Sequence, residues 1–241
     1  MCYGSPDMGL RERKKEQTRQ RIAETAWRLF ADRGFDQVTV AEVARQAEVA
    51  TATVFNYFPT KEDLFYARLE TFEARLVEAI GTRPVGEPVL ATFRRHLLES
   101  GGLLAQVEAG DPEALERVRT LHRVIAASPA LRAREQQVLA AAADALAAIV
   151  TADIGVAPGD PGAQVAANAL VGVQRVLIDY TRRRVLADEA PGRLAADVRQ
   201  LGRRVFALLE HGLADYAPKP DATRPAPGLG GSERSGAYGV W

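Results

Sequence analysis

The chain of 241 residues is poor in the residues that build disulfides, metal sites and strands. One cysteine, Cys2, and three histidines exclude an internal disulfide and a zinc site with the usual close ligand spacing. Alternating Val/Ile/Thr runs and Asn-Gly hairpin turns are absent, so we expect no β-structure. Neither charge is in excess, because 31 basic side chains balance 31 acidic ones. The overall charge therefore does not indicate a nucleic-acid or membrane partner. Only a local cluster of like charges can indicate one.

Long apolar runs are also scarce. The best candidate for a membrane span, residues 139–150, is rich in alanine and carries Asp144. The first ten residues lack the apolar core of a signal peptide. We therefore expect a cytoplasmic protein with no membrane partner.

Good helix formers, namely Ala, Leu, Arg and Glu, dominate what is present. The sequence predicts an all-α fold of about nine helices, three short ones followed by longer ones. We expect an N-terminal helix-turn-helix domain over residues 11–64 and a helical ligand-sensing and dimerisation domain, the sensor domain, over residues 65–216. Residues 1–10 lack periodicity and residues 217–241 are rich in proline and glycine, so both ends are expected to be disordered.

Three short segments near the N-terminus predict the helix-turn-helix. The first helix ends at Gly34, the second begins after Thr39 as its N-cap, and the third is stopped by Pro59. A tight turn over residues 48–51 separates the second helix from the third, which is the arrangement of this motif. Thr60 is the expected cap of a long fourth helix that runs to about residue 80.

The third segment has the composition of a surface that reads bases. Val54, Phe55 and Phe58 are predicted to point inward. The side chains left outside are small, uncharged and mostly hydrogen-bonding: Thr51, Ala52, Thr53, Asn56 and Tyr57. Such a surface enters a major groove without desolvating a charge, and asparagine pairs with adenine through two hydrogen bonds. A plain polar helix face is the alternative.

Other residues are candidates for phosphate contacts. The N-terminus of the second helix, near Thr39, and that of the fourth, beside Lys61, offer free N–H groups. Arg45 projects from the second helix, and Tyr57 carries a phenolic hydroxyl. Residues 11–21 hold six basic and two acidic side chains. This local excess fits either an arm that seeks a DNA groove or a solubilising helix end.

These segments resemble the N-terminal domain of the TetR family of bacterial repressors. The resemblance rests on TRQRIAETAWRLFADRGF (18–35), VTV (38–40), VARQAEV (43–49) and TVFNYFPTKEDL (53–64). It implies a three-helix DNA reader and a small molecule that releases a dimer from a palindromic double-stranded DNA operator, with the fourth helix changing the spacing of the two readers. The positions that match the family's DNA contacts are Thr39, Arg45, Thr51, Ala52, Thr53, Asn56, Tyr57 and Lys61. The segment ASPALRAREQQ (127–137) is also similar to actinobacterial members with acyl-CoA-like ligands.

The sequence departs from the family pattern in the turn. Glu48 stands where the family usually has glycine, and a left-handed backbone there costs on the order of 1 kcal/mol. Ala50 stands where a serine or threonine usually caps the third helix, and losing that cap costs about 1 kcal/mol. Thr51 is an alternative cap, which would compromise it as a base reader. Phe55 replaces a common tyrosine.

The sensor domain shows no Ser/His/Asp order, no HExxH motif and no phosphate loop, so we expect no enzyme and no cofactor. Its excess of apolar helix faces predicts a bundle with a mostly apolar cavity. Because charged candidates are few, we expect a small hydrophobic effector of fatty-acyl or aromatic type. The candidate lining residues are Phe72, Phe93, Leu97, His122, Ile125, Leu146, Asn168, Gln174 and Arg175, of which Gln174 or Arg175 is expected to be forced inward. A filled core is the alternative.

The last two helices carry apolar stripes that predict a homodimer. The final helix repeats Leu194, Val198, Leu201, Val205, Leu208 and Leu209, and the preceding one Ala166, Ala169, Val173, Val176 and Tyr180. Two such stripes form a four-helix bundle between twin subunits, whereas a fully intramolecular core is the alternative. Two rival functions remain open: a helical enzyme, or a lipid-binding protein without sequence-specific DNA binding.

Overall fold

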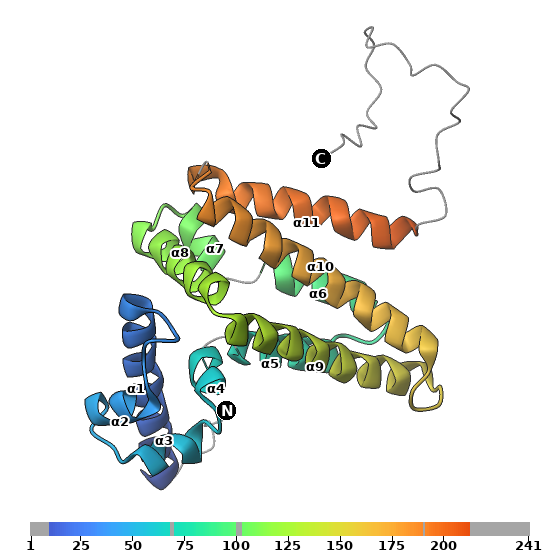
Figure 1. Ribbon diagram of the computed structural model, residues 1–241. Coiled ribbons are helices and arrows are strands. Elements are labelled where there is room, and N and C mark those ends of the chain that lie inside the picture. Colours follow the sequence, from blue (N-terminus) through green and yellow to red (C-terminus); the bar gives the residue numbers. More distant parts are fainter. Residues whose placement is uncertain (1–9, 68–69, 100–102, 190, 213–241) are drawn as a thin grey trace, which may run out of the picture.

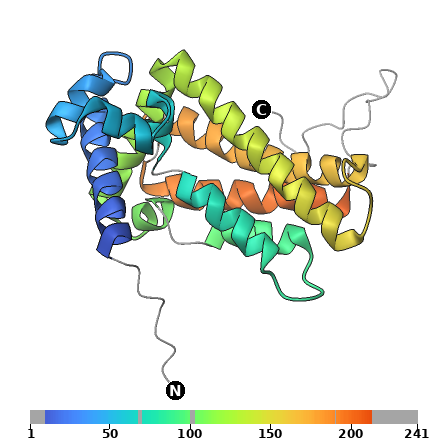
Figure 2. The same cartoon turned by 90° about the horizontal axis from the view of Figure 1, so that it is seen from below.

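The computed structural model describes residues 10–67, 70–99, 103–189 and 191–212 (Figure 1). Over these ranges the regular elements are eleven α-helices and one short 3-10 helix, which confirms the all-α prediction with two helices more than expected. The predicted disordered ends lie outside the described residues, apart from Leu10, where the first helix begins. Figure 2 shows the N-terminal domain at one end and the long helices running away from it.

The N-terminal domain contains four helices, of which the first, with 24 residues, is not short as predicted and the fourth has only six residues. They are α1 (Leu10–Arg33), α2 (Val40–Gln46), α3 (Thr51–Tyr57) and α4 (Lys61–Tyr66). Its core is formed by apolar side chains spaced along one face of each helix, which is the pattern that an amphipathic helix buries. Fully or almost fully buried examples are Ile22, Ala26, Phe30, Val43, Val54 and Phe58.

The prediction of one long fourth helix that runs to about residue 80 is wrong. Helix α4 ends at Tyr66, and a separate helix, α5 (Glu70–Gly81), follows it. Leu64, Phe65, Tyr66 and Ala67 are all at most 4% exposed. A regular helix at the surface buries only one face, so four consecutive buried residues mark a segment that is enclosed on every side. The connection between the two domains therefore contains an anchored segment and not one straight helix.

The sensor domain continues with α6 (Val89–Glu99), α7 (Leu103–Glu108), α8 (Pro112–Ala127), α9 (Pro129–Ile154), α10 (Pro161–Leu186), the 3-10 helix η1 (Pro191–Arg193) and α11 (Leu194–His211). Three of these helices begin with proline, as predicted. The preceding Asp111 and Asp160 cap α8 and α10 with their carboxylates. Ser128 makes no such bond to α9, and its hydroxyl donates to Asp36 Oδ1, 2.9 Å away.

Helix α9 corrects the expectation that no segment is long and apolar enough to cross a membrane. It has 26 residues and an 18-residue window of mean hydropathy 1.6. In the fold this helix packs against α10, α5 and α8, and a third of that window is buried (Figure 1). The core helix of a bundle meets the same criteria, and Glu135 in α9 is ion-paired with Arg182 in α10. Length and composition alone are therefore weak grounds for a membrane span.

Candidate DNA-binding surface and sensor core

The turn between α2 and α3 has the left-handed backbone that the sequence raised as a possibility. Glu48 has φ +55°, and the N–H of Val49 donates to the carbonyl of Ala44 at 3.0 Å. This is the way in which helices commonly end on a left-handed residue, usually glycine. The turn therefore keeps the usual geometry and accommodates a side chain that disfavours it.

The N-cap of α3 is Ala50, which makes no side-chain hydrogen bond. Thr51 is the first residue of the helix and is exposed, so the alternative in which Thr51 replaces the missing cap is wrong. Its hydroxyl is consequently available on the surface of the domain.

The outward surface of α3 is broader than predicted. Val54 and Phe58 are buried, 1% and 2% exposed, but Phe55 is 46% exposed, so its predicted inward orientation is wrong. Positions 54 and 58 lie one above the other on one face, whereas position 55 is rotated by about 100° from 54. Thr51, Ala52 and Asn56 are exposed, and Thr53 and Tyr57 are half-buried. We call these five side chains, together with Phe55, the α3 surface.

Basic residues lie on the two helices that precede α3, Arg45 on α2 and Arg19 on α1. Arg45 in α2 has a side chain that is 75% exposed, 3.7 Å from Glu42, and Arg33 pairs with the same carboxylate at 2.8 Å. The Arg33 hydrogen bond lowers the pKa of Glu42. The Arg19 guanidinium lies 5.1 Å from the centre of the Phe58 ring. Residues 10–21 belong to α1, which favours the helix-end interpretation of this basic segment.

Thr39 and Thr60 both act as N-caps. The Thr39 hydroxyl accepts from the N–H of Glu42 at 3.2 Å, and Thr60 forms a reciprocal capping box with Asp63. Lys61 at the start of α4 is half-buried, and its Nζ lies 4.2 Å from the centre of the Phe35 ring. Burial lowers its pKa. To reach a phosphate, this ammonium must leave the aromatic ring.

The two domains share one apolar cluster. Val124, Ile125 and Leu131, where α8 meets α9, are buried in the same cluster as the core of the N-terminal domain. Hydrogen bonds reinforce the contact, because the Tyr66 hydroxyl donates to the carbonyl of Leu131 at 3.0 Å and Asp63 pairs with Arg134 at 2.6 Å. We call the end of α8 and the start of α9 the α8–α9 corner. The α8–α9 corner therefore packs directly on the core of the N-terminal domain.

A buried histidine lies in α8 near this corner. His122 is 7% exposed, and its Nδ1 has no hydrogen-bond partner among the described residues. Burial lowers its pKa to about 4, and the positive charge of Arg182 acts in the same direction. His122 is thus neutral at pH 7.

The candidate effector residues do not gather around one cavity. Phe93 and Leu146 are fully buried and Leu97 packs against their cluster, while Ile125 belongs to the cluster shared with the N-terminal domain. The Phe72 ring lies 5.0 Å from that of His96 and is partly exposed. Asn168 and Arg175 are exposed, so Gln174 is the member of its pair that is forced inward, at 3% exposed.

Sequence reasoning missed Glu73. This glutamate in α5 accepts a hydrogen bond of 2.6 Å from Gln174 Nε2 in α10, and burial raises its pKa. Leu76 and Ile80, three and seven residues further on, are both buried. A glutamate in register with them on an apolar stripe was the signal that it faces the core.

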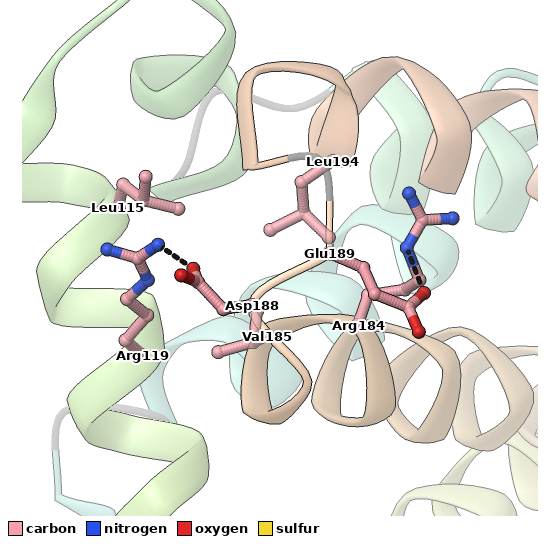
Figure 3. Close-up of a pocket in the computed structure, with 7 residues that line it drawn as sticks. All are labelled: Leu115, Arg119, Arg184, Val185, Asp188, Glu189 and Leu194. Atoms are coloured by element: carbon pink, nitrogen blue, oxygen red, sulfur yellow. Dashed lines mark hydrogen bonds and ion pairs between the residues drawn. The ribbon is translucent and has the colours of Figure 1, made fainter.

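Two hollows open between helices of the sensor domain. One has space for about a single water and is lined by Leu115, Arg119, Arg184, Val185, Asp188, Glu189 and Leu194 (Figure 3). In it Arg119 pairs with Asp188, and Arg184 pairs with Glu189 at 3.2 Å. The other hollow, of about 500 Å³, is mostly polar and is lined by Ala79, Thr82, Arg83, Pro84, Thr92, Arg95, His96 and Glu99. Neither has the apolar lining predicted for the effector cavity.

An uncharged exposed helix of a helix-turn-helix, joined firmly to a helical second domain, defines a DNA-binding transcriptional regulator. Comparison with known families agrees with this class. Residues 22–67 match the family described as bacterial regulatory proteins, tetR family, and residues 101–214 match the MftR C-terminal domain. The chain belongs to the TetR family of transcriptional regulators.

Relatives of known name are similar over part of their length. The HTH-type transcriptional regulator TcmR of Streptomyces glaucescens is 28% identical over 130 residues, which cover 52% of this chain and 55% of TcmR. LuxR of Vibrio harveyi is 50% identical over 46 residues, 19% of this chain and 22% of LuxR. The chain thus spans about half the length of TcmR and less than a quarter of the length of LuxR.

A solved structure shows the same fold. NalD of Pseudomonas aeruginosa, described as the secondary repressor of the MexAB-OprM multidrug efflux pump, superimposes with a TM-score of 0.50 and 19% identity. The match covers 80% of this chain and 96% of NalD. At this identity the likeness concerns the fold.

Proposed function

We propose that this protein is a transcriptional repressor that binds a palindromic DNA operator as a homodimer and is released by a small hydrophobic effector. The observation that carries the proposal is the α3 surface, which is exposed and uncharged and has basic side chains on the two helices that precede it. A helix with such a surface enters the major groove at no cost for desolvating a charge. We also propose a cytoplasmic location, because that is where the DNA of a bacterial regulator lies.

The proposed contacts divide by chemistry. Asn56 pairs with adenine, and Thr51, Ala52 and Thr53 contact base edges and thymine methyl groups. Phe55 joins them, because its exposed ring suits an apolar contact with a thymine methyl group. The proposed phosphate contacts, which position the helix without reading sequence, are Thr39, Arg45, Tyr57 and Lys61.

The proposed homodimer pairs α10 and α11 of two subunits. Val165, Val176 and Leu186 on α10 are 68%, 44% and 48% exposed, whereas Val173 is buried within the subunit. The side of α10 that carries the exposed residues suits a second copy, because burying apolar side chains against an identical surface is the common solution in symmetric oligomers. Specific binding then requires the two α3 helices to lie about 34–36 Å apart, or a multiple of this distance.

The proposed effector is a hydrophobic compound of fatty-acyl or aromatic type that enters the sensor domain. It shifts the population only by binding one arrangement of the helices better than the other. The α8–α9 corner and α4 carry the change to the helix-turn-helix, since both pack on its core.

Binding to DNA upstream of the protein's own coding sequence tests the proposal. We expect a salt-dependent gel shift and a palindromic footprint. Asn56→Ala should weaken operator binding by about 1–3 kcal/mol and leave binding to random DNA unchanged. Lys61→Ala should weaken binding to both and lower the salt slope by about 1.

Gln137→Ala is the matched control, because this exposed amide lies in α9, outside the N-terminal domain and outside the helices proposed for the dimer. Equal losses on operator and random DNA for both Asn56→Ala and Lys61→Ala contradict the assignment of roles. The absence of any sequence-specific complex favours a helical enzyme or a lipid-binding protein.

A further inference from the structure

Two oxygen atoms on facing helices of the sensor core lack a hydrogen-bond donor. They are Glu73 Oε2 in α5 and Gln174 Oε1 in α10, both buried and both without a partner among the described residues. Other buried polar side chains of the sensor domain are of both kinds, since Arg182 Nε and His122 Nδ1 also lack a partner among the described residues, whereas Thr181 and Glu135 are satisfied. The Thr181 hydroxyl donates to the carbonyl of Leu177 at 2.8 Å, and Glu135 pairs with Arg182 at 2.6 Å. Most buried polar atoms in proteins have partners, so this pair of orphans requires an explanation.

The two side chains are already held together in a defined geometry. Gln174 Nε2 donates to Glu73 Oε1 at 2.6 Å, which uses a donor of the amide and leaves acceptors facing the core. The walls around them are apolar, because Leu76 and Ile80 on α5 and Leu177 on α10 belong to one buried cluster. A polar group that enters here is shielded from water, which strengthens its electrostatic interactions.

The chemistry of the missing partner follows from the two acceptors. A protonated amine carries hydrogen-bond donors and a positive charge, so it satisfies both oxygens and neutralises the Glu73 carboxylate. A hydroxyl supplies one donor and no charge. A carboxylate supplies no donor and places a second negative charge beside the first. Burial raises the pKa of Glu73, as expected for a buried carboxyl group without a neighbouring cation.

We infer that Glu73 and Gln174 form the polar end of the effector site and that the effector is a hydrophobic amine. The inference rests on the proposed function and replaces the fatty-acyl part of its effector class: the aromatic or aliphatic body lies among the apolar side chains near α5 and α10, and its ammonium group donates to Glu73 Oε2 and Gln174 Oε1. Compounds that end in a free carboxylate, such as fatty acids, are excluded from this site.

Titration calorimetry of the full chain with n-octylamine, 1-octanol and octanoate tests this inference, because the three probes share one alkyl chain. We expect saturable binding of n-octylamine with one site per subunit, about tenfold tighter than 1-octanol, and no saturable binding of octanoate. Glu73→Gln should weaken n-octylamine about tenfold and leave 1-octanol within about threefold. Glu78→Gln, an exposed glutamate on the same helix, is the matched control and should change neither.

Gln174→Leu is a second variant, which keeps the test decisive if Glu73→Gln fails to fold. It removes the amide oxygen and should weaken n-octylamine about threefold or more. Octanoate that binds as tightly as n-octylamine overturns the inference, and so does n-octylamine binding that is equal in the wild type and the folded variants. A DNA footprint without ligand separates the two hypotheses. A normal footprint with no amine binding defeats only this inference, whereas a missing footprint defeats the proposed repressor function.

Discussion

Glu48 offers a test of how the helix-turn-helix is held, because its backbone has φ +55° and its side chain is exposed. A residue with a Cβ atom pays about 1–2 kcal/mol in the left-handed conformation. Glycine avoids this strain, but its greater freedom in the unfolded chain offsets about 0.4–1 kcal/mol. We therefore expect Glu48→Gly to raise the free energy of unfolding by about 1 kcal/mol. In a chain of this size that corresponds to a melting temperature higher by about 2–4 °C.

Urea denaturation followed by circular dichroism measures the effect, with Glu48→Ala as the matched control. Alanine removes the carboxylate and keeps the Cβ atom, so Glu48→Ala should stay within about 0.5 kcal/mol of the wild type. If Glu48→Ala stabilises the protein as much as Glu48→Gly, the gain comes from removing charge and the strain argument is refuted.

Three further predictions concern stability. Ala50→Ser should add about 1 kcal/mol by capping α3, while Ala50→Gly adds only a few tenths in the same urea titration; equal effects would contradict a capping role. His122 is neutral in the fold with a pKa of about 4 against 6.5 when unfolded, so wild-type stability should fall by about 3 kcal/mol as the pH drops from 6.5 to 4. His122→Leu should reduce this fall in stability between pH 6.5 and 4. An unchanged slope would show that other titrating groups cause the fall. Tyr66→Phe should cost about 1 kcal/mol by removing the hydrogen bond to Leu131, and unchanged unfolding would show that this bond contributes nothing.

The helix-turn-helix was predictable because its signals are local. Caps at Thr39 and Thr60 and the spacing of Val54 and Phe58 each depend on a few neighbouring residues, and the structure confirms them. The prediction for Phe55 is wrong because hydrophobicity alone does not determine burial. A large apolar residue one position from a buried one lies on a different helix face, and single exposed aromatics are common enough on protein surfaces.

The sensor domain was less predictable because its site depends on contacts between distant segments. Asn168, Gln174 and Arg175 all interrupt apolar runs, yet only Gln174 is buried. Which of them faces inward depends on how α10 packs against α9 and α8, and the partner of Gln174, Glu73, lies 101 residues away in the chain. Sequence periodicity describes each helix separately. It does not specify how one helix is rotated against another when they pack.

The junction between the domains indicates where an effector signal must pass. Tyr66 and Asp63 bind residues of the α8–α9 corner. About one turn further along α9 lies Glu135, which is ion-paired with Arg182 in α10. Gln174 lies on the same helix as Arg182, about two turns away. In the proposed dimer α10 also carries the exposed apolar residues of the interface, so we expect a ligand that shifts α10 to change the subunit contact and the α8–α9 corner together. Both changes would alter the distance between the two α3 helices, and a DNA duplex of fixed pitch discriminates strongly against a wrong distance.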